Sequence, residues 1–213
     1  MYRRHFVRTL PLLGAALSVP GVMAQELTLT ASQGEGPFYP DRLPLDTDND
    51  LLIINDALTP AVGTITWLGG RILDGSGTPI RNAEVEMWQV DGNGVYLHSG
   101  SDNAGNRDGN FQGYGRFLTG STGEYVFRTV RPVPYPGRTA HVHFIVKTPG
   151  RDAFTTQMYI EGEPRNATDT LLNRVSDPMA RASIIVPFKA MPGSRMGELS
   201  AEFNVVLGRT PSA

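Results

Sequence analysis

Short runs of apolar residues, several of them alternating with polar residues, recur along most of the chain. The stretches between them include DGSGTP, DGNG, STGE and RPVPYPG, which are rich in residues that favour turns. Strands of this length and spacing predict an all-β fold, a β-sandwich or a related barrel, and we expect an antiparallel β-sandwich with long loops. The strand candidates are 64–73, 83–90, 115–119, 124–130, 140–147, 154–160, 182–188 and 198–207.

Helical periodicity is nearly absent from the same region. Only NATDTLLNRVSD, residues 166–177, has a pattern that predicts a short surface helix. The chain holds 24 Gly and 16 Pro, and it shows no repeat, linker or low-complexity tract. We therefore expect a single domain over residues 25–213.

The first 24 residues follow a different pattern. A basic head precedes an apolar stretch from Leu10 to Met23, and small residues stand near its end. This predicts an export signal cleaved after Ala24, too short and too broken by Pro and Gly for stable membrane insertion. Adjacent Arg3 and Arg4 are typical of twin-arginine signals, and a general secretory signal is the alternative. The expected location is periplasmic or secreted.

Composition and charge exclude several classes of function. The chain of 213 residues is 40% hydrophobic and 19% charged, with a net charge of −2. Removing the signal takes away three basic side chains and no acid, which lowers the net charge to −5. Lys and Arg form no run beyond the N-terminus, so we expect no nucleic-acid partner. The absence of cysteine excludes disulfides, thiolate zinc sites and iron–sulfur clusters.

Two of the four histidines stand one residue apart in PYPGRTAHVHF, residues 134–144. Side chains alternate along a strand, so His141 and His143 share a face with Cα atoms about 7 Å apart and can converge on one metal ion. The intervening Val142, with Phe144 and Val146, would face the core. Incidental histidines on a solvent-facing edge are the alternative. The arginine and tyrosine in the preceding turn favour the metal site.

The remaining ligands must come from His, Tyr, Asp or Glu. Acidic residues are scarce near the pair, which makes a hard trivalent ion held by phenolate oxygens plausible. Tyr125 alternates within a strand and is expected to pack in the core. Tyr114 and Tyr159 fit either core or pocket lining. The full set of candidates is Tyr39, Tyr96, Tyr114, Tyr125, Tyr135 and Tyr159.

Several ordered blocks resemble the intradiol ring-cleavage dioxygenases, non-haem Fe(III) enzymes that open catechols between the two hydroxyls. The blocks are EGPFYP (35–40), DGSGTPIRNAEVEMWQVDGNGVYLH (74–98), FQGYGRFLTGSTGEYVFRTVRPVPYP (111–136), RTAHVHF (138–144) and TTQMYIEGE (155–163). The resemblance implies a prealbumin-like sandwich with long active-site loops. It also implies cleavage of an aromatic diol by O₂ to a cis,cis-muconate-type product.

Site residues follow from the same resemblance, position by position. It implies that Fe(III) is held by Tyr96, Tyr135, His141 and His143. Tyr135 would leave the metal and act as a base when substrate binds. Arg138 would place a cation beside the ring, and Gln157 would orient the substrate or a ligand. Tyr39 in EGPFYP would line the substrate pocket, whereas His98 is not expected to be a ligand.

The chain also departs from the family pattern. Only five residues separate Tyr135 from His141, where members usually carry a longer insertion. The chain lacks the N-terminal helical dimerisation region of the catechol branch, so it looks more like a protocatechuate-type subunit or a shorter exported relative. Residues 74–87 also resemble transthyretin-like binding domains, which bind no iron, and this remains the alternative. A zinc or copper site is a weaker one.

The substrate and the assembly stay open at this point. Protocatechuate, catechol, hydroxyquinol and other diphenols all fit the implied chemistry. The chain could form a homo-oligomer, stand alone or need a second subunit type.

Overall fold

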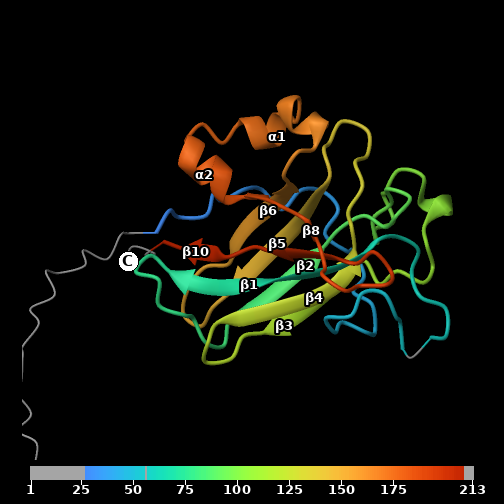
Figure 1. Ribbon diagram of the computed structural model, residues 1–213, viewed down its shortest axis with the longest axis horizontal. Helices are drawn as coiled ribbons and strands as arrows, with labels where there is room; N and C mark the ends of the chain where they lie inside the picture. Colours follow the sequence, from blue (N-terminus) through green and yellow to red (C-terminus); the bar gives the residue numbers. More distant parts are fainter. Residues whose placement is uncertain (1–26, 56, 209–213) are drawn as a thin grey trace, which may run out of the picture.

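The computed structural model describes residues 27–55 and 57–208, so the expected export signal lies outside the described residues. β-Strands dominate this part of the chain (Figure 1). They are β1 Ile65–Asp74, β2 Glu84–Trp88, β3 Tyr114–Leu118, β4 Glu124–Val130, β5 His141–Lys147, β6 Phe154–Ile160, β7 Ile185–Val186, β8 Lys189–Ala190, β9 Leu199–Glu202 and β10 Val205–Leu207.

The strands form two sheets of mixed direction. The first has the order β3-β2-β5-β6-β7, and the second has β10-β1-β9-β8 with β4 paired to β1. The prediction of an antiparallel fold is therefore wrong for three pairs, because β1 runs parallel to β9 and β10, and β6 runs parallel to β7. A parallel pair needs a crossover connection, and residues 161–184 supply one between β6 and β7.

Both sheets contribute to one hydrophobic core. Leu68 and Phe127 of the second sheet and Met87 and Phe144 of the first are fully buried in it. The Phe144 ring lies 5.2 Å, centroid to centroid, from that of Phe203. Burial of each such side chain contributes about 1.5–3 kcal/mol. Val142, Phe144 and Val146 belong to this core, which confirms the expected orientation of β5.

The two α-helices of the described residues, α1 (Thr170–Asn173) and α2 (Pro178–Ser183), are short and follow β6, and Figure 1 draws both above β6. The helix expected over 166–177 is present only as the 3₁₀ turn Pro164–Ala167 and as α1, Thr170–Asn173. The start of the strand candidate 182–188 instead belongs to α2, Pro178–Ser183. A second 3₁₀ turn, Ala104–Asn106, precedes β3.

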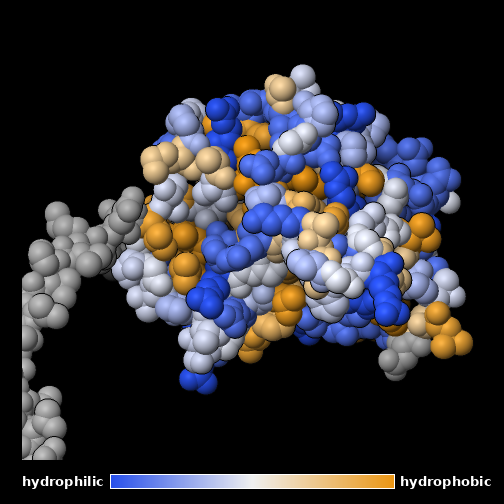
Figure 2. Space-filling model, viewed as in Figure 1, coloured by the Kyte–Doolittle hydropathy of each residue, from blue (hydrophilic) through white to orange (hydrophobic). Residues whose placement is uncertain are grey.

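None of the helices in the described ranges is long and apolar enough to cross a bilayer. The face seen in Figure 2 carries small hydrophobic patches separated by hydrophilic residues.

Candidate metal centre

The two histidines of β5 point away from the shared core, onto the outer face of the first sheet. In the ladder, His143 pairs with Trp88 of β2 and Gln157 of β6, and His141 pairs with Tyr159. Residues opposite one another in a ladder point to the same face. Both histidines are nevertheless almost completely buried. Loops cover this face, and they bring in further aromatic residues.

Tyr96 comes from the loop that follows β2. Asp91 shapes this loop, because its carboxylate accepts hydrogen bonds from the backbone N–H groups of Asn93 and Val95. The Tyr96 Oη then lies 3.1 Å from Nε2 of His141 and 3.0 Å from Nε2 of His143. The two Nε2 atoms are 3.2 Å apart. Three potential ligand atoms thus form a nearly equilateral triangle.

Protons alone do not satisfy this triangle. His141 Nδ1 lies 2.6 Å from the carbonyl oxygen of Thr139, which can only accept, so the ring proton of His141 resides on Nδ1. Its Nε2 therefore presents a lone pair. Tyr96 and His143 supply at most one proton each for three close contacts. A bound cation would relieve the side of the triangle that is left without a proton.

The spacing and chemistry of the three atoms fit a metal ion. Ligand atoms about 2.0–2.1 Å from a metal and about 90–110° apart lie about 2.8–3.4 Å from one another. All three measured separations fall in that range. Within residues 27–55 and 57–208, no group of three or more His, Cys, Asp or Glu side chains could hold a metal ion. A metal bound here would therefore need phenol oxygen.

Burial sets the charge state of the centre. It lowers the pKa of His141 to about 3, with the nearby Arg138 acting in the same direction. Burial also lowers the pKa of His143, and it raises that of Tyr96 well above its usual value, with the Tyr135 phenol adding to this rise. Neutral imidazoles are the form that binds metals. The phenol needs a nearby cation to lose its proton.

Tyr135, the second expected tyrosine, lies beside this triangle. Its ring centroid is 5.6 Å from that of Tyr96 and 5.5 Å from that of His141. A tight turn holds it, since its carbonyl accepts from Arg138 N at 3.0 Å and from Arg165 Nη1 at 3.3 Å. Tyr135 is half-buried, whereas Tyr96 is enclosed. The more accessible phenol is thus the one expected to move.

Arg138 and Gln157 touch each other directly. The Nη2 of Arg138 donates to Oε1 of Gln157 at 2.6 Å and to the Tyr159 hydroxyl at 3.3 Å. Gln157 Nε2 donates to the carbonyl of Gly34, which ties the N-terminal segment to β6. Tyr159, whose role the sequence left open, belongs to the buried core cluster and also joins this network through its hydroxyl. Burial raises its pKa to about 12, and Arg138 opposes the rise.

Tyr39 is separated from His143 by the side chain of Trp88. Its hydroxyl donates to Oε2 of Glu86 at 3.0 Å, and its ring meets Trp88 edge-on at 5.1 Å. Trp88 in turn stacks on His143. Tyr39 therefore lies one aromatic ring behind a proposed ligand, and its predicted contact with substrate stays a prediction. His98 accepts from Gly100 N and is not among the converging groups.

Sequence reasoning missed two residues of this region. Trp88 packs on His143, and its position opposite His143 emerges only from the strand register. Asp169 is buried beside Arg138, with its Oδ2 2.9 Å from Arg138 Nε. Burial alone would raise the pKa of Asp169, but the backbone N–H groups of Leu172 and Thr139, together with Arg138, hold it below its usual value. No local motif marks this pairing across 31 residues.

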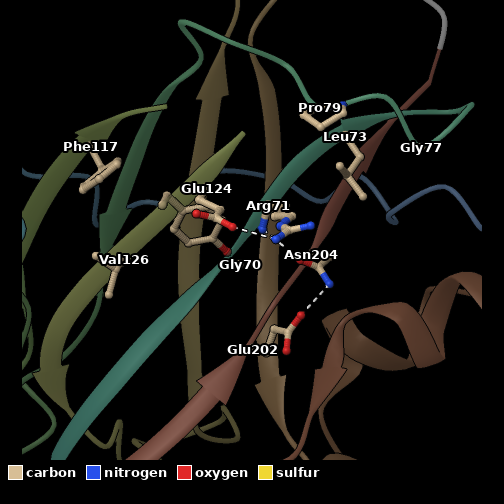
Figure 3. A pocket seen from close by; sticks show the side chains of 11 residues that line it. Gly70, Arg71, Leu73, Gly77, Pro79, Phe117, Glu124, Val126, Glu202 and Asn204 are labelled. Carbon is tan, nitrogen blue, oxygen red and sulfur yellow. Dashed lines mark hydrogen bonds and ion pairs between the residues drawn. The ribbon is translucent and has the colours of Figure 1, made fainter. Parts of the chain in front are cut away.

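A mostly apolar cleft of about 600 Å³ reaches this network at Gln157. It lies between residues 31–36 and 171–177, and Gly36 lines it close to His143. A second hollow, of about 760 Å³, lies on the other sheet (Figure 3). Its polar groups are already joined, Arg71 with Glu124 and Asn204 with Glu202. Of the candidate tyrosines it is lined by Tyr125 alone, which was expected to pack in the core.

Comparisons with known proteins all point to dioxygenases. A family model described as Dioxygenase matches residues 34–209. The beta chain of protocatechuate 3,4-dioxygenase from Burkholderia cepacia is 34% identical over 146 residues, which cover 65% of this chain and 62% of that protein. Hydroxyquinol 1,2-dioxygenase from Nocardioides simplex is 26% identical over 212 residues, covering 89% and 66%. The chain thus spans slightly less than two thirds of these relatives.

A solved structure shares the fold. It is the dioxygenase domain of a dioxygenase–carbohydrate-binding protein fusion from Streptomyces sp. SirexAA-E, with a TM-score of 0.65 and 28% sequence identity. The match covers 86% of this chain and 100% of that one.

Proposed function

The chain belongs to the intradiol dioxygenase family, and from this premise we propose that it cleaves a catechol-type aromatic diol between its hydroxyls. O₂ is the co-substrate and a cis,cis-muconate-type diacid is the product, so the C–C bond between the two hydroxyl carbons breaks. The observation that carries the proposal is the convergence of Tyr96 Oη with Nε2 of His141 and His143.

We assign Fe(III) to this centre, with Tyr96, Tyr135, His141 and His143 as the residues that would hold it. When bound, the ion supplies the Lewis acidity that stabilises the diol as a dianion and prepares it for O₂. The two neutral imidazoles provide lone pairs, and burial excludes competing water.

The other residues bind, orient and move protons. Tyr135, half-buried and held by its backbone, would accept one of the two diol protons in the phenolate form that a bound cation favours, and a hydroxide would take the other. Arg138 presents a fixed cation where negative charge develops on the ring. Gln157 keeps that guanidinium in place through its Oε1.

The cleft beside Gln157 favours diols that carry an apolar ring substituent. Its volume of about 600 Å³ far exceeds a bare catechol ring, and apolar groups supply most of its lining. Substituents that point towards Gly36 and Leu171 would be buried there. Initial rates with a series of alkyl-substituted catechols test this point, and rates that fall steadily with substituent size contradict it.

A visible absorption spectrum of residues 25–213 with an iron assay tests the function. A broad tyrosinate-to-iron band, near one iron per chain, and a shift to longer wavelength with catechol are expected. A protein that stays colourless after iron loading overturns the proposal and favours a transthyretin-like binding module. A colourless protein that binds zinc would point to other chemistry.

We also propose export after cleavage at Ala24, a prealbumin-like arrangement of the two sheets and a homo-oligomeric assembly. The twin-arginine character of the signal is tested by Arg3→Lys with Arg4→Lys, which should retain the chain in the cytoplasm. Light scattering of the mature chain tests the assembly.

A further inference from the structure

Asp169 is the most heavily bonded side chain near the proposed centre. Its Oδ1 accepts from the backbone N–H groups of Leu171 and Leu172, both at 3.0 Å, and so caps the first turn of α1. Its Oδ2 accepts from Nε of Arg138 and from the backbone N of Thr139, both at 2.9 Å. The side chain is fully covered. Four donors thus converge on one buried carboxylate.

These bonds reach both parts of the site. Arg138 is gripped at two points, since Asp169 holds its Nε while Gln157 holds its Nη2. Thr139 donates its N–H to Asp169 and accepts at its carbonyl from Nδ1 of His141. The hydroxyl of Thr139 also donates to Oδ1 of Asn166. Hydrogen bonds to Asp169 and Asn166, which precede α1, therefore hold the segment 138–141 in place.

We infer that Asp169 is a positioning residue for ring cleavage, which fixes the guanidinium of Arg138 beside Gln157 and the substrate. The inference rests on the proposed function and adds a residue to it. Arg138 has many rotamers, and a cation that must meet charge developing on the ring acts only if it is held in place beforehand. Two opposing acceptors, Asp169 and Gln157, provide that restraint.

Asp169→Asn separates positioning from helix capping. An asparagine can keep its oxygen at the Oδ1 position and continue to cap α1. Its NH₂ then faces Nε–H of Arg138 and N–H of Thr139, where donor meets donor. Asp74 offers a control away from the site, because its Oδ1 accepts hydrogen bonds from the backbone N–H groups of Ser76 and Thr78 in the turn after β1. It bonds no residue of the proposed site and does not line the cleft beside Gln157.

The test uses the full iron-loaded chain with catechol and protocatechuate as probes. For Asp169→Asn we expect kcat to fall about 10- to 100-fold, with iron content, the tyrosinate-to-iron band and the dissociation constant of catechol nearly unchanged. Asp74→Asn should keep the wild-type kcat. In the Arg138→Gln background, Asp169→Asn should lower kcat no further, because the group it positions is gone.

A second readout is independent of turnover. In the iron-free chain, the Nε–H resonance of Arg138 should exchange slowly with solvent in the wild type and quickly in Asp169→Asn. If Asp169→Asn fails to fold, Asp169→Glu keeps the charge but displaces the carboxylate, and its kcat should also fall.

The outcomes are separable. A folded Asp169→Asn or Asp169→Glu variant with wild-type kcat contradicts the inference, as does an undiminished effect in the Arg138→Gln background. Loss of the iron band in Asp169→Asn would also contradict it, because the residue would then act through the metal site. A wild-type chain that turns over neither diol contradicts the proposed function itself.

Discussion

The indole of Trp88 stacks on the imidazole of His143, with ring centroids 4.7 Å apart and planes 15° from parallel. The strand register places the two residues opposite each other, and Trp88 is completely buried. Trp88 Nε1 has no hydrogen-bond partner among the described residues. The indole therefore acts on His143 by packing alone, as a wall that fixes the plane of the imidazole ring.

This contact predicts a difference between two substitutions. Trp88→Ala should lower the free energy of unfolding by about 3–5 kcal/mol and reduce iron content, because His143 loses its stacking partner. Trp88→Phe retains an aromatic face and loses no hydrogen bond, so it should keep most of the iron. Chemical denaturation and an iron assay on both variants provide the measurement.

Trp67 is the matched control. It lies on the other sheet, is 37% exposed and donates to Glu198. Trp67→Ala should lower stability less than Trp88→Ala and leave iron content unchanged. Equal iron loss in Trp67→Ala and Trp88→Ala would show that global destabilisation, and not stacking, empties the site.

Substitutions at two buried tyrosines can distinguish a role in metal binding from a role in packing. Tyr96 Oη meets the histidine pair, whereas Tyr125 Oη donates to the carbonyl of Phe203 at 2.6 Å inside the core. Tyr96→Phe should abolish turnover and weaken iron binding at least about tenfold, since it removes an anionic ligand. Tyr125→Phe should cost about 1 kcal/mol of stability and keep full colour. Visible spectra and iron titrations of the two variants decide, and a coloured, active Tyr96→Phe protein rules Tyr96 out as a ligand.

The strands could be predicted from the sequence because side chains alternate between the two faces of a strand even where both faces are buried. β4, β5 and β6 have the predicted bounds almost to the residue, and the two faces of β5 divide as expected. The run at 182–188 misled, because an apolar stretch of this length does not distinguish helix from strand. The Asp177 cap and Pro178 at the first position start α2 instead.

The site was predictable only where its residues are close in sequence or stand in a motif. His141 and His143 share a face by periodicity alone. Tyr96 joins them through a loop shaped by Asp91, which no periodicity describes. No sequence pattern marked Asp169 as part of the site. An aspartate before a short helix is already explained by its role as the helix cap. Its contact with Arg138 depends on how the crossover from β6 to β7 packs.

The lowered pKa of Asp169 predicts how stability depends on pH. A carboxyl group with a pKa lower in the folded than in the unfolded chain contributes stability above its unfolded pKa of about 3.9. That contribution is lost as the pH falls through the folded value. The unfolding free energy of the wild type should therefore fall more steeply between about pH 5 and pH 2 than that of Asp169→Asn. Urea denaturation at a series of pH values measures both slopes, and parallel curves would contradict the prediction.

Gly36 and Gly150 allow backbone strain to be separated from contact with the site. Both have positive φ, 80° and 73°, so alanine costs each about 1 kcal/mol of stability. A Cβ on Gly36 would lie 3.4 Å from Cε1 of His143, whereas one on Gly150 meets nothing within 4 Å. Gly36→Ala should therefore shift the tyrosinate-to-iron band and lower kcat, because relief of its strain moves the segment that covers His143. Gly150→Ala should lose as much stability as Gly36→Ala but keep the wild-type spectrum and kcat. Identical spectra and rates for the two variants would show that Gly36 has no part in shaping the centre.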